Sequence, residues 1–207
     1  MHDKSGGAHG SGSSGSGAVA EAVRLEPLST VRLDNHLVAD FRCARSERIA
    51  AFFGRECIEF VNKNYCRVFV LPDPGDPARI LGFYTLSMSL LLKDLVTNSD
   101  QRRVVRGLPI PMALIGFMGR CDSAPRGIGE ALIVDAARRV HRSQDIVAWG
   151  LMVESEGGPG TKLWDWYRSQ EFTPAKDEQP AKDEQEVAPS GVLYGALKKF
   201  IPELKGS

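Results

Sequence analysis

Residues 123–132 read SAPRGIGEAL and stand between an apolar, strand-like segment and an amphipathic helical pattern. Two glycines, Gly127 and Gly129, fall where the strand gives way to the helix. Glycine lets the backbone approach a ligand closely, and the first N–H groups of a helix have no partners inside it. The helix dipole also favours an anion there. The stretch therefore predicts a site for a phosphorylated cofactor, although tight packing of strand against helix would explain the two glycines equally well.

Two common nucleotide motifs do not fit this turn. A P-loop requires a lysine and a serine or threonine after its last glycine, and no lysine follows Gly129. A dinucleotide-binding turn requires a third glycine, and Leu132 occupies that position. The cofactor predicted here is therefore phosphorylated but is held by neither of these motifs.

The composition is that of an ordinary globular domain. The chain has 207 residues, of which 43% are hydrophobic and 25% charged. Its 26 basic and 26 acidic residues give no overall sign of a nucleic-acid or membrane partner. No apolar run approaches the roughly 20 residues of a membrane-spanning helix, and the Gly/Ser-rich start is no secretory signal. We expect one cytoplasmic domain that does not associate with membranes.

Cysteine and histidine spacing indicates neither a metal site nor a disulfide framework. The cysteines are Cys43, Cys57, Cys66 and Cys121. They form no C-x-x-C pair and lie in apolar or strand-like surroundings, which predicts reduced, mostly buried thiols. The four histidines lack ligand spacing, so we expect no metal.

Composition shifts divide the chain. Residues 1–20 are rich in glycine and serine and are predicted to be a disordered tail. A single domain is expected over residues 21–201, followed by a short tail over 202–207. Within the domain, residues 174–189 contain PAKDEQ twice, and such a charged repeat predicts an exposed insert.

Hydrophobic periodicity gives the order of the elements. Ser46 is a predicted N-cap for a helix over Glu47–Asn62. Further helices are expected from the glycine turn to about Ser143, and from Thr161 or Lys162 to Ser169. Strands are predicted over Tyr65–Leu71, Arg79–Leu90, Ile110–Cys121, Ile146–Val153 and Val192–Lys198, with a proline-rich turn at Leu71–Pro77. This order is typical of an α/β (α+β) protein with a mixed sheet and helices on its faces.

The glycine turn and a later aromatic segment together resemble one enzyme family. The spacing Arg126-x-x-Gly129-x-Ala131 is similar to the Q/R-x-x-G-x-G/A signature of GNAT-type N-acetyltransferases. Residues 163–172, LWDWYRSQEF, resemble that family's A-x-x-F-Y-x-x-x-G-F pattern, with Tyr167 as its tyrosine. The resemblance spans most of the chain outside the tail. It implies the GNAT acyl-CoA N-acyltransferase fold, a mixed central sheet with flanking helices, and acetyl-CoA as the donor.

Three further stretches resemble a subgroup, the acetyltransferase toxins of bacterial type II toxin–antitoxin systems. They are DFRC at 40–43, GFYTLS at 82–87 and LPIP at 108–111. The resemblance implies acetylation of the α-amine of aminoacyl-tRNA, a block of translation and an antitoxin protein partner. The sequence leaves the oligomeric state open, with a homodimer as one alternative. The chain departs from the subgroup at Met118, where arginine is usual, and at Glu171, where glycine is usual.

The resemblance also assigns the cofactor contacts. The pyrophosphate is expected at Arg126, Gly127, Ile128, Gly129, Glu130 and Ala131, with backbone N–H groups as donors. The pantetheine is expected to pair with the backbone of Gly119, Arg120 and Cys121, where one N–H polarises the thioester carbonyl.

The resemblance implies that Tyr167 is the general acid for the departing thiolate, and the ordinary tyrosine pKa near 10 suits that role. Its alternative role is that of a core aromatic with a bonded hydroxyl. Glu154 and Glu156 follow a strand beside the expected cleft. Two roles are open for these carboxylates: either one is a base that acts through water, or both are solvated loop charges. Six arginines are compatible with a basic surface for RNA, and equally with solvated faces and i,i+4 pairing on a helix. They stand at positions 102, 103, 106, 138, 139 and 142.

Two other functions stay open. One is acetylation of a small-molecule or protein amine. The other is a catalytically silent GNAT fold that binds CoA or a partner protein, which the departures at Met118 and Glu171 would allow.

Overall fold

The computed structural model describes residues 26–27, 38, 40–97, 108–176 and 191–205. The predicted tail at 1–20, most of the PAKDEQ insert, and Arg102, Arg103 and Arg106 lie outside the described residues. The predicted domain boundaries therefore stay predictions.

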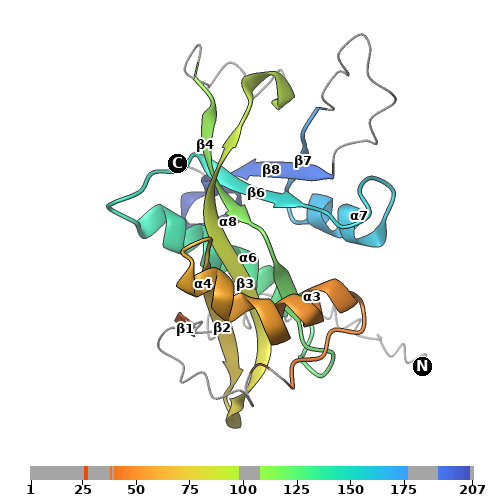
Figure 1. The fold of residues 1–207 in the computed structure, drawn as a ribbon. Coiled ribbons are helices and arrows are strands. Elements are labelled where there is room, and N and C mark those ends of the chain that lie inside the picture. Colours follow the sequence, from red (N-terminus) through yellow and green to blue (C-terminus); the bar gives the residue numbers. More distant parts are fainter. Residues whose placement is uncertain (1–25, 28–37, 39, 98–107, 177–190, 206–207) are drawn as a thin grey trace, which may run out of the picture.

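An eight-stranded mixed sheet forms the centre of the fold (Figure 1). Its main path runs through β1 (Glu26–Pro27), β2 (Arg67–Asp73), β3 (Asp76–Leu91), β4 (Ile110–Ile115), β6 (Gly150–Glu154), β8 (Val192–Ala196) and β7 (Thr173–Pro174). The remaining strand, β5 (Met118–Arg120), pairs with β3 alone. Strands β4 and β6 are parallel, and every other pair is antiparallel. The predicted mixed sheet is confirmed.

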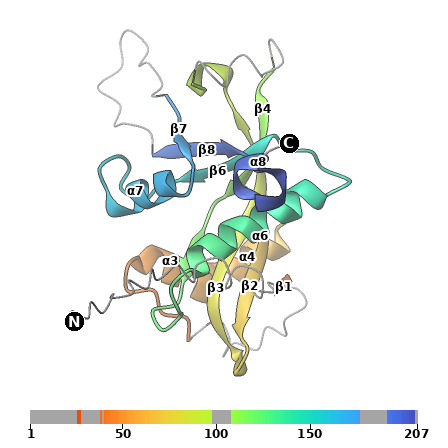
Figure 2. The same cartoon turned by 180° about the vertical axis from the view of Figure 1, so that it is seen from behind.

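Helices cover both faces of this sheet. One face carries α3 (Glu47–Ala51), the π-helical turn η1 (Phe52–Glu56) and α4 (Cys57–Asn62). Figure 2, turned by 180°, shows α6 (Ile128–Arg142) and α8 (Leu197–Phe200) on the opposite face. Helix α7 (Lys162–Ser169) lies beyond the end of β6. Short 3-10 turns occupy Lys93–Leu95 and Pro202–Leu204.

The first predicted helix has the expected bounds but contains a wider turn. Ser46 caps it, since its Oγ accepts the backbone N–H of Ile49 at 3.3 Å. In the middle, the N–H of Cys57 donates to the carbonyl of Phe52, five residues back. This π turn contains two consecutive buried phenylalanines, and the ring of Phe52 stacks on Phe117 at 3.6 Å between centroids.

The prediction of one strand over Ile110–Cys121 is wrong, because a bulge divides it into β4 and β5. Ser87 pairs with Leu114 and Tyr84 with Met118, so two residues of β3 face three on the other side. Thr85 closes the break, since its buried Oγ1 accepts the N–H of Phe117 at 2.9 Å.

Two other strand predictions had wrong bounds for a related reason. The segment at Ile146 and Val147 is apolar, but these side chains are 49% and 79% exposed in a loop before β6. The last predicted strand ends at Ala196, and its final residues begin α8. Apolar composition alone does not distinguish these edges from a buried strand.

A buried polar contact joins the sheet to α6. The hydroxyl of Tyr84, a fully buried residue, donates to Oδ2 of Asp135 at 2.5 Å. Arg139 donates to the same oxygen at 2.6 Å and lies over the ring of Phe69. Of the two alternatives left open for Arg139, the structure shows pairing on the helix, because its charge is used inside this cluster.

We expect Tyr84→Phe to lower the free energy of unfolding by about 1–3 kcal/mol, because it removes a buried hydrogen bond to a carboxylate. Burial and Asp135 both raise the Tyr84 pKa. This contribution is therefore complete below about pH 10, the ordinary tyrosine value, and declines as the pH rises further. Urea titrations of the wild type and Tyr84→Phe should show a smaller difference in the free energy of unfolding above pH 10 than at pH 8. A difference that does not change with pH would contradict this link between the Tyr84 pKa and stability.

Candidate functional site

The glycine turn has the geometry of an anion site at a helix start. Gly127 is the N-cap of α6, with φ of +92°, a left-handed conformation that favours glycine. A Cβ there would meet nothing within 4 Å, so the turn opens outward. Ala131 donates its N–H to the Gly127 carbonyl at 3.1 Å. The predicted donor Ala131 is therefore unavailable, and the free first-turn N–H groups belong to residues 127–130.

Gly129 has a different role from the one its motif suggests. A Cβ on Gly129 would lie 2.8 Å from Cζ2 of Trp166, so the glycine lets α7 pack on the first turn of α6. The indole Nε1 of Trp166 also donates to Oε1 of Glu130 at 3.4 Å. The structure thus brings the two predicted motifs into contact. The sequence offered two explanations for this glycine, close approach of the backbone to a phosphate and tight packing of strand against helix. Neither of them includes the contact with Trp166.

The remaining predicted residues of the turn divide into exposed and buried side chains. Arg126 is exposed at the turn, whereas the side chains of Ile128 and Ala131 are in the core. Only backbone groups of those two residues could contact a ligand. Below the turn, Nη1 of Arg120 donates to the carbonyls of Ala124 and Pro125 at 2.5 and 3.4 Å.

Strand β5 has an edge without a neighbouring strand in the described part of the chain. Val153 pairs with Ile115, and beyond this pair β6 diverges from β5 (Figure 1). Toward β3, the carbonyl of Phe117 accepts from Thr85 and the N–H of Cys121 donates to Leu81.

Because backbone direction alternates along a strand, Met118 and Arg120 direct their N–H and C=O groups to the open edge. Of the three residues predicted to pair with pantetheine, only Arg120 directs its backbone N–H and C=O groups to this edge. The N–H of Cys121 is already bonded to β3, and the backbone of Gly119 faces β3. The missing Cβ of Gly119 makes room for Ile49 of α3. Met118 is the residue that the sequence reasoning missed, because the register was not visible from the sequence.

Tyr167 lies on α7 and directly follows Trp166, whose ring covers Gly129. Its ring packs between Trp166 and Phe172, with centroid distances of 5.0 and 5.6 Å, and its side chain is 6% exposed. No described residue forms a hydrogen bond with its hydroxyl. Burial raises the Tyr167 pKa above its ordinary value. The group is therefore protonated near neutral pH, so it can donate a proton.

The two candidate bases differ in their contacts. Glu156 accepts a hydrogen bond from Oγ of Ser46 at 2.8 Å, which ties its carboxylate to the start of α3. Glu154 is exposed at the end of β6, one residue after Val153, which forms the last pair with β4. Between them, Ser155 is 3% exposed and its Oγ has no partner among the described residues.

We expect Ser155→Ala to raise the free energy of unfolding of the unliganded protein by about 1 kcal/mol, because it removes a buried hydroxyl that has no partner. Thr85→Val is the matched control, since the buried Thr85 hydroxyl is bonded and its loss should destabilise the fold. Urea titration measures both. A loss of stability in Ser155→Ala would show that the hydroxyl is satisfied after all.

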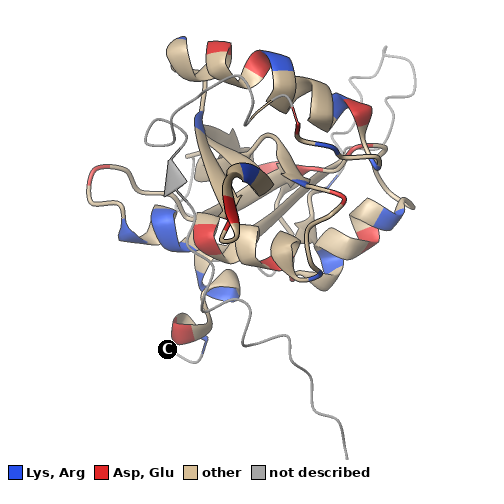
Figure 3. Ribbon diagram, turned by 90° about the horizontal axis from the view of Figure 1, so that it is seen from below, with Lys and Arg blue, Asp and Glu red and all other residues tan. Residues whose placement is uncertain are grey.

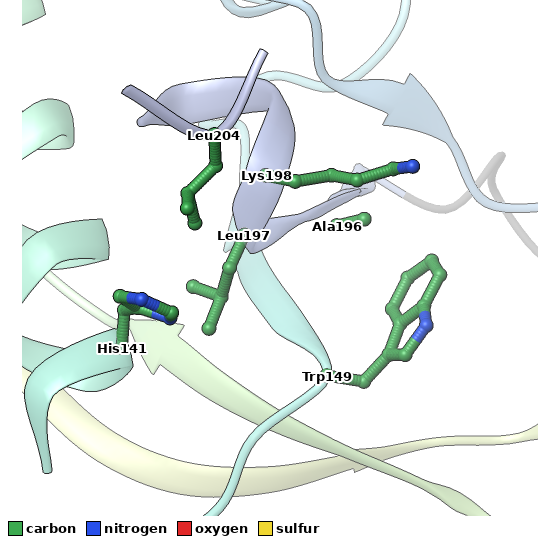
Figure 4. A pocket seen from close by; sticks show the side chains of 6 residues that line it. All are labelled: His141, Trp149, Ala196, Leu197, Lys198 and Leu204. Carbon is green, nitrogen blue, oxygen red and sulfur yellow. The ribbon is translucent and has the colours of Figure 1, made fainter. Parts of the chain in front are cut away.

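One cavity lies away from these residues, at the C-terminal end of α6 (Figure 4). Its volume is about 390 Å³, and it is lined by His141, Trp149, Ala196, Leu197, Lys198 and Leu204. None of these is a predicted site residue. Within the described ranges, no group of acidic, cysteine or histidine side chains could hold a metal ion, and no helix could span a membrane.

The described arginines among the six candidates for a basic surface differ in their pairing. Arg138 pairs with Glu203 and Arg139 with Asp135, which leaves Arg142 without a described ion pair. Figure 3 shows basic and acidic residues mixed along the ribbons rather than separated onto different faces. For Arg139, the alternative of i,i+4 pairing on the helix is the one that holds.

The splayed mixed sheet, the glycine turn and the helix that follows it define the GNAT acyl-CoA N-acyltransferase fold. The chain matches no protein-family profile and no curated protein. It is similar to the solved structure of AtaT complexed with acetyl-methionyl-tRNAfMet, with a TM-score of 0.71 and 22% identity over 89% of this chain and 99% of that one.

Two further solved structures agree with this fold. A tyrosine-to-phenylalanine mutant of KacT gives a TM-score of 0.68 at 21% identity, over 86% of this chain and 96% of the other. AtaTR bound with acetyl-CoA gives 0.62 at 20% identity, over 90% and 99%. The predicted fold is confirmed.

Proposed function

We propose that this chain is an acetyl-CoA-dependent N-acetyltransferase that transfers an acetyl group to a primary amine by direct attack. The observation that carries the proposal is the contact between the two motifs: α7, with Tyr167, packs on the first turn of α6 through Trp166 and Gly129. The anion site, the open edge of β5 and a buried proton donor thus belong to one region of a GNAT fold.

Each part of this region has a role in binding the donor. The first-turn N–H groups after Gly127 would hold the pyrophosphate, with exposed Arg126 adding positive charge. The outward backbone of Met118 and Arg120 would pair with the pantetheine amides as a neighbouring strand would. A backbone N–H on this edge would also polarise the thioester carbonyl.

The chemistry requires two proton movements. Acetyl-CoA supplies an acetyl carbon as a thioester; a carbon–nitrogen bond to the amine forms and the carbon–sulfur bond breaks. Tyr167 donates its proton to the leaving sulfur and regains one from solvent. Glu154, exposed beside the edge, would take the proton that the amine loses, directly or through water.

We further propose that the acceptor is the α-amine of aminoacyl-tRNA and that the chain is a translation-blocking toxin. The similarity to AtaT, solved with acetyl-methionyl-tRNAfMet, supports this acceptor, and the complex of the toxin AtaT with the C-terminus of the antitoxin AtaR supports an antitoxin partner. An α-amine has a pKa near 8, against about 10.4 for lysine, so a strong base is unnecessary.

Two measurements test this proposal. Acetyl-CoA should raise the melting temperature, whereas NAD and ATP should not. In a cell-free extract depleted of small molecules, the chain should inhibit translation only when acetyl-CoA is added. Binding without inhibition would favour a small-molecule or protein amine, or a catalytically silent fold. A chain that acetyl-CoA does not stabilise would contradict the proposal as a whole.

A further inference from the structure

Arg120 supports the glycine turn from inside. Its guanidinium leaves the end of β5 and donates through Nη1 to the carbonyls of Ala124 and Pro125, which directly precede Arg126 and Gly127. These bonds hold two carbonyl oxygens toward the arginine. Because an oxygen lone pair facing the turn would repel an anion, this arrangement favours a turn that presents N–H groups alone.

The charge of Arg120 is not balanced by a carboxylate. Arg138 and Arg139 are each paired with an acid at 2.5 and 2.6 Å, whereas no described ion pair includes Arg120. Its side chain is partly buried, and a guanidinium does not lose its proton in a protein. A partly buried positive charge without a counter-ion is unfavourable, and an anion seated on the turn would offset that cost.

We propose that Arg120 is a positioning residue for the diphosphate of the donor: it fixes the carbonyls of residues 124 and 125 and supplies a cation beneath the turn. This inference rests on the proposed function, because it assigns the anion to acetyl-CoA. It differs from the role of Arg126, which is exposed at the mouth of the turn and fixes no backbone group in the described structure.

The test compares two donors that differ in the diphosphate. Acetyl-CoA carries it, whereas S-acetylpantetheine ends before it. Arg120→Met should raise the KM for acetyl-CoA about tenfold, as expected for loss of a charge-assisted contact. For S-acetylpantetheine, the KM of Arg120→Met should differ from that of the wild type by less than about twofold. With both donors, kcat should stay at the wild-type value.

Two variants separate charge from general damage. Arg120→Lys keeps the charge but not the planar fork, so it should lie between the wild type and Arg120→Met. Arg67→Met, an exposed arginine on β2, is the control and should change neither KM. If Arg120→Met raised the KM for both donors equally, the inference would be overturned, because that result indicates a collapsed turn rather than a lost diphosphate contact.

Calorimetric binding of CoA keeps this inference distinguishable from the proposed function. If the wild type binds CoA but transfers no acetyl group, the proposed function fails, and weaker binding by Arg120→Met still supports the role of Arg120. If Arg120→Met binds CoA as tightly as the wild type, Arg120 does not position the diphosphate. A wild type that does not bind CoA overturns both proposals.

Discussion

Tyr167→Phe is expected to lower kcat about a hundredfold while leaving the affinity for acetyl-CoA within about twofold of the wild type. The substitution removes one hydroxyl and keeps the ring that packs between Trp166 and Phe172. That hydroxyl has no hydrogen-bond partner among the described residues, so its loss should not disturb the fold. Thiol release from acetyl-CoA in the presence of an acceptor amine measures kcat, and calorimetry measures binding.

The control for this variant is Tyr65→Phe, because Tyr65 is 63% exposed and lies between α4 and β2, outside the candidate site. Unchanged turnover in Tyr167→Phe would remove Tyr167 from the mechanism. The pH profile adds a second check. Since burial raises the Tyr167 pKa, the donor stays protonated where an ordinary tyrosine ionises, and kcat should show no alkaline decline up to about pH 10.

Gly129→Val is expected to lower kcat/KM for acetyl-CoA about a hundredfold. A Cβ on Gly129 would lie 2.8 Å from the Trp166 ring, against an ordinary contact of about 3.5–4.0 Å. The Trp166 ring, α6 or α7 must shift by about 1 Å, and a misplacement of that size in the site costs about a hundredfold in rate. Steady-state kinetics with varied acetyl-CoA measures the effect.

The contact with Trp166 makes a specific rescue possible. Trp166→Leu shortens the side chain that Val would strike, so the double variant with Gly129→Val should recover part of the lost kcat/KM. Gly54→Val is the matched control, because a Cβ on Gly54 would meet only the Val38 carbonyl, at 3.8 Å. If Gly129→Val were harmless, the packing of α7 on α6 would not position the site.

Local sequence patterns predicted the parts of the fold that depend on neighbouring residues. The Ser46 cap and the start of α6 follow from side chains and glycines within a few positions. The bulge between β4 and β5 was not predictable, because it depends on which residues between Ile110 and Cys121 face Thr85 and its neighbours on β3. An apolar run shows that a strand is buried but does not show its register.

The same limit applies to the candidate site. The motifs around Gly129 and Tyr167 were visible in the sequence, but their contact through Trp166 depends on helix packing. Ser46 and Glu156 are 110 positions apart, and only the fold shows that their side chains meet. Arg120 was predicted for its backbone, and its side-chain contacts beneath the turn became evident only from the structure.

The most direct test of the account is acetyl transfer itself. The purified chain is incubated with isotope-labelled acetyl-CoA and a mixture of aminoacyl-tRNAs, and the amino acids released by mild base are analysed by mass spectrometry. We predict labelled N-acetyl amino acids with the wild type and a strong reduction with Tyr167→Phe. If no labelled N-acetyl amino acid forms while the same preparation binds acetyl-CoA, the proposed aminoacyl-tRNA acetylation is contradicted.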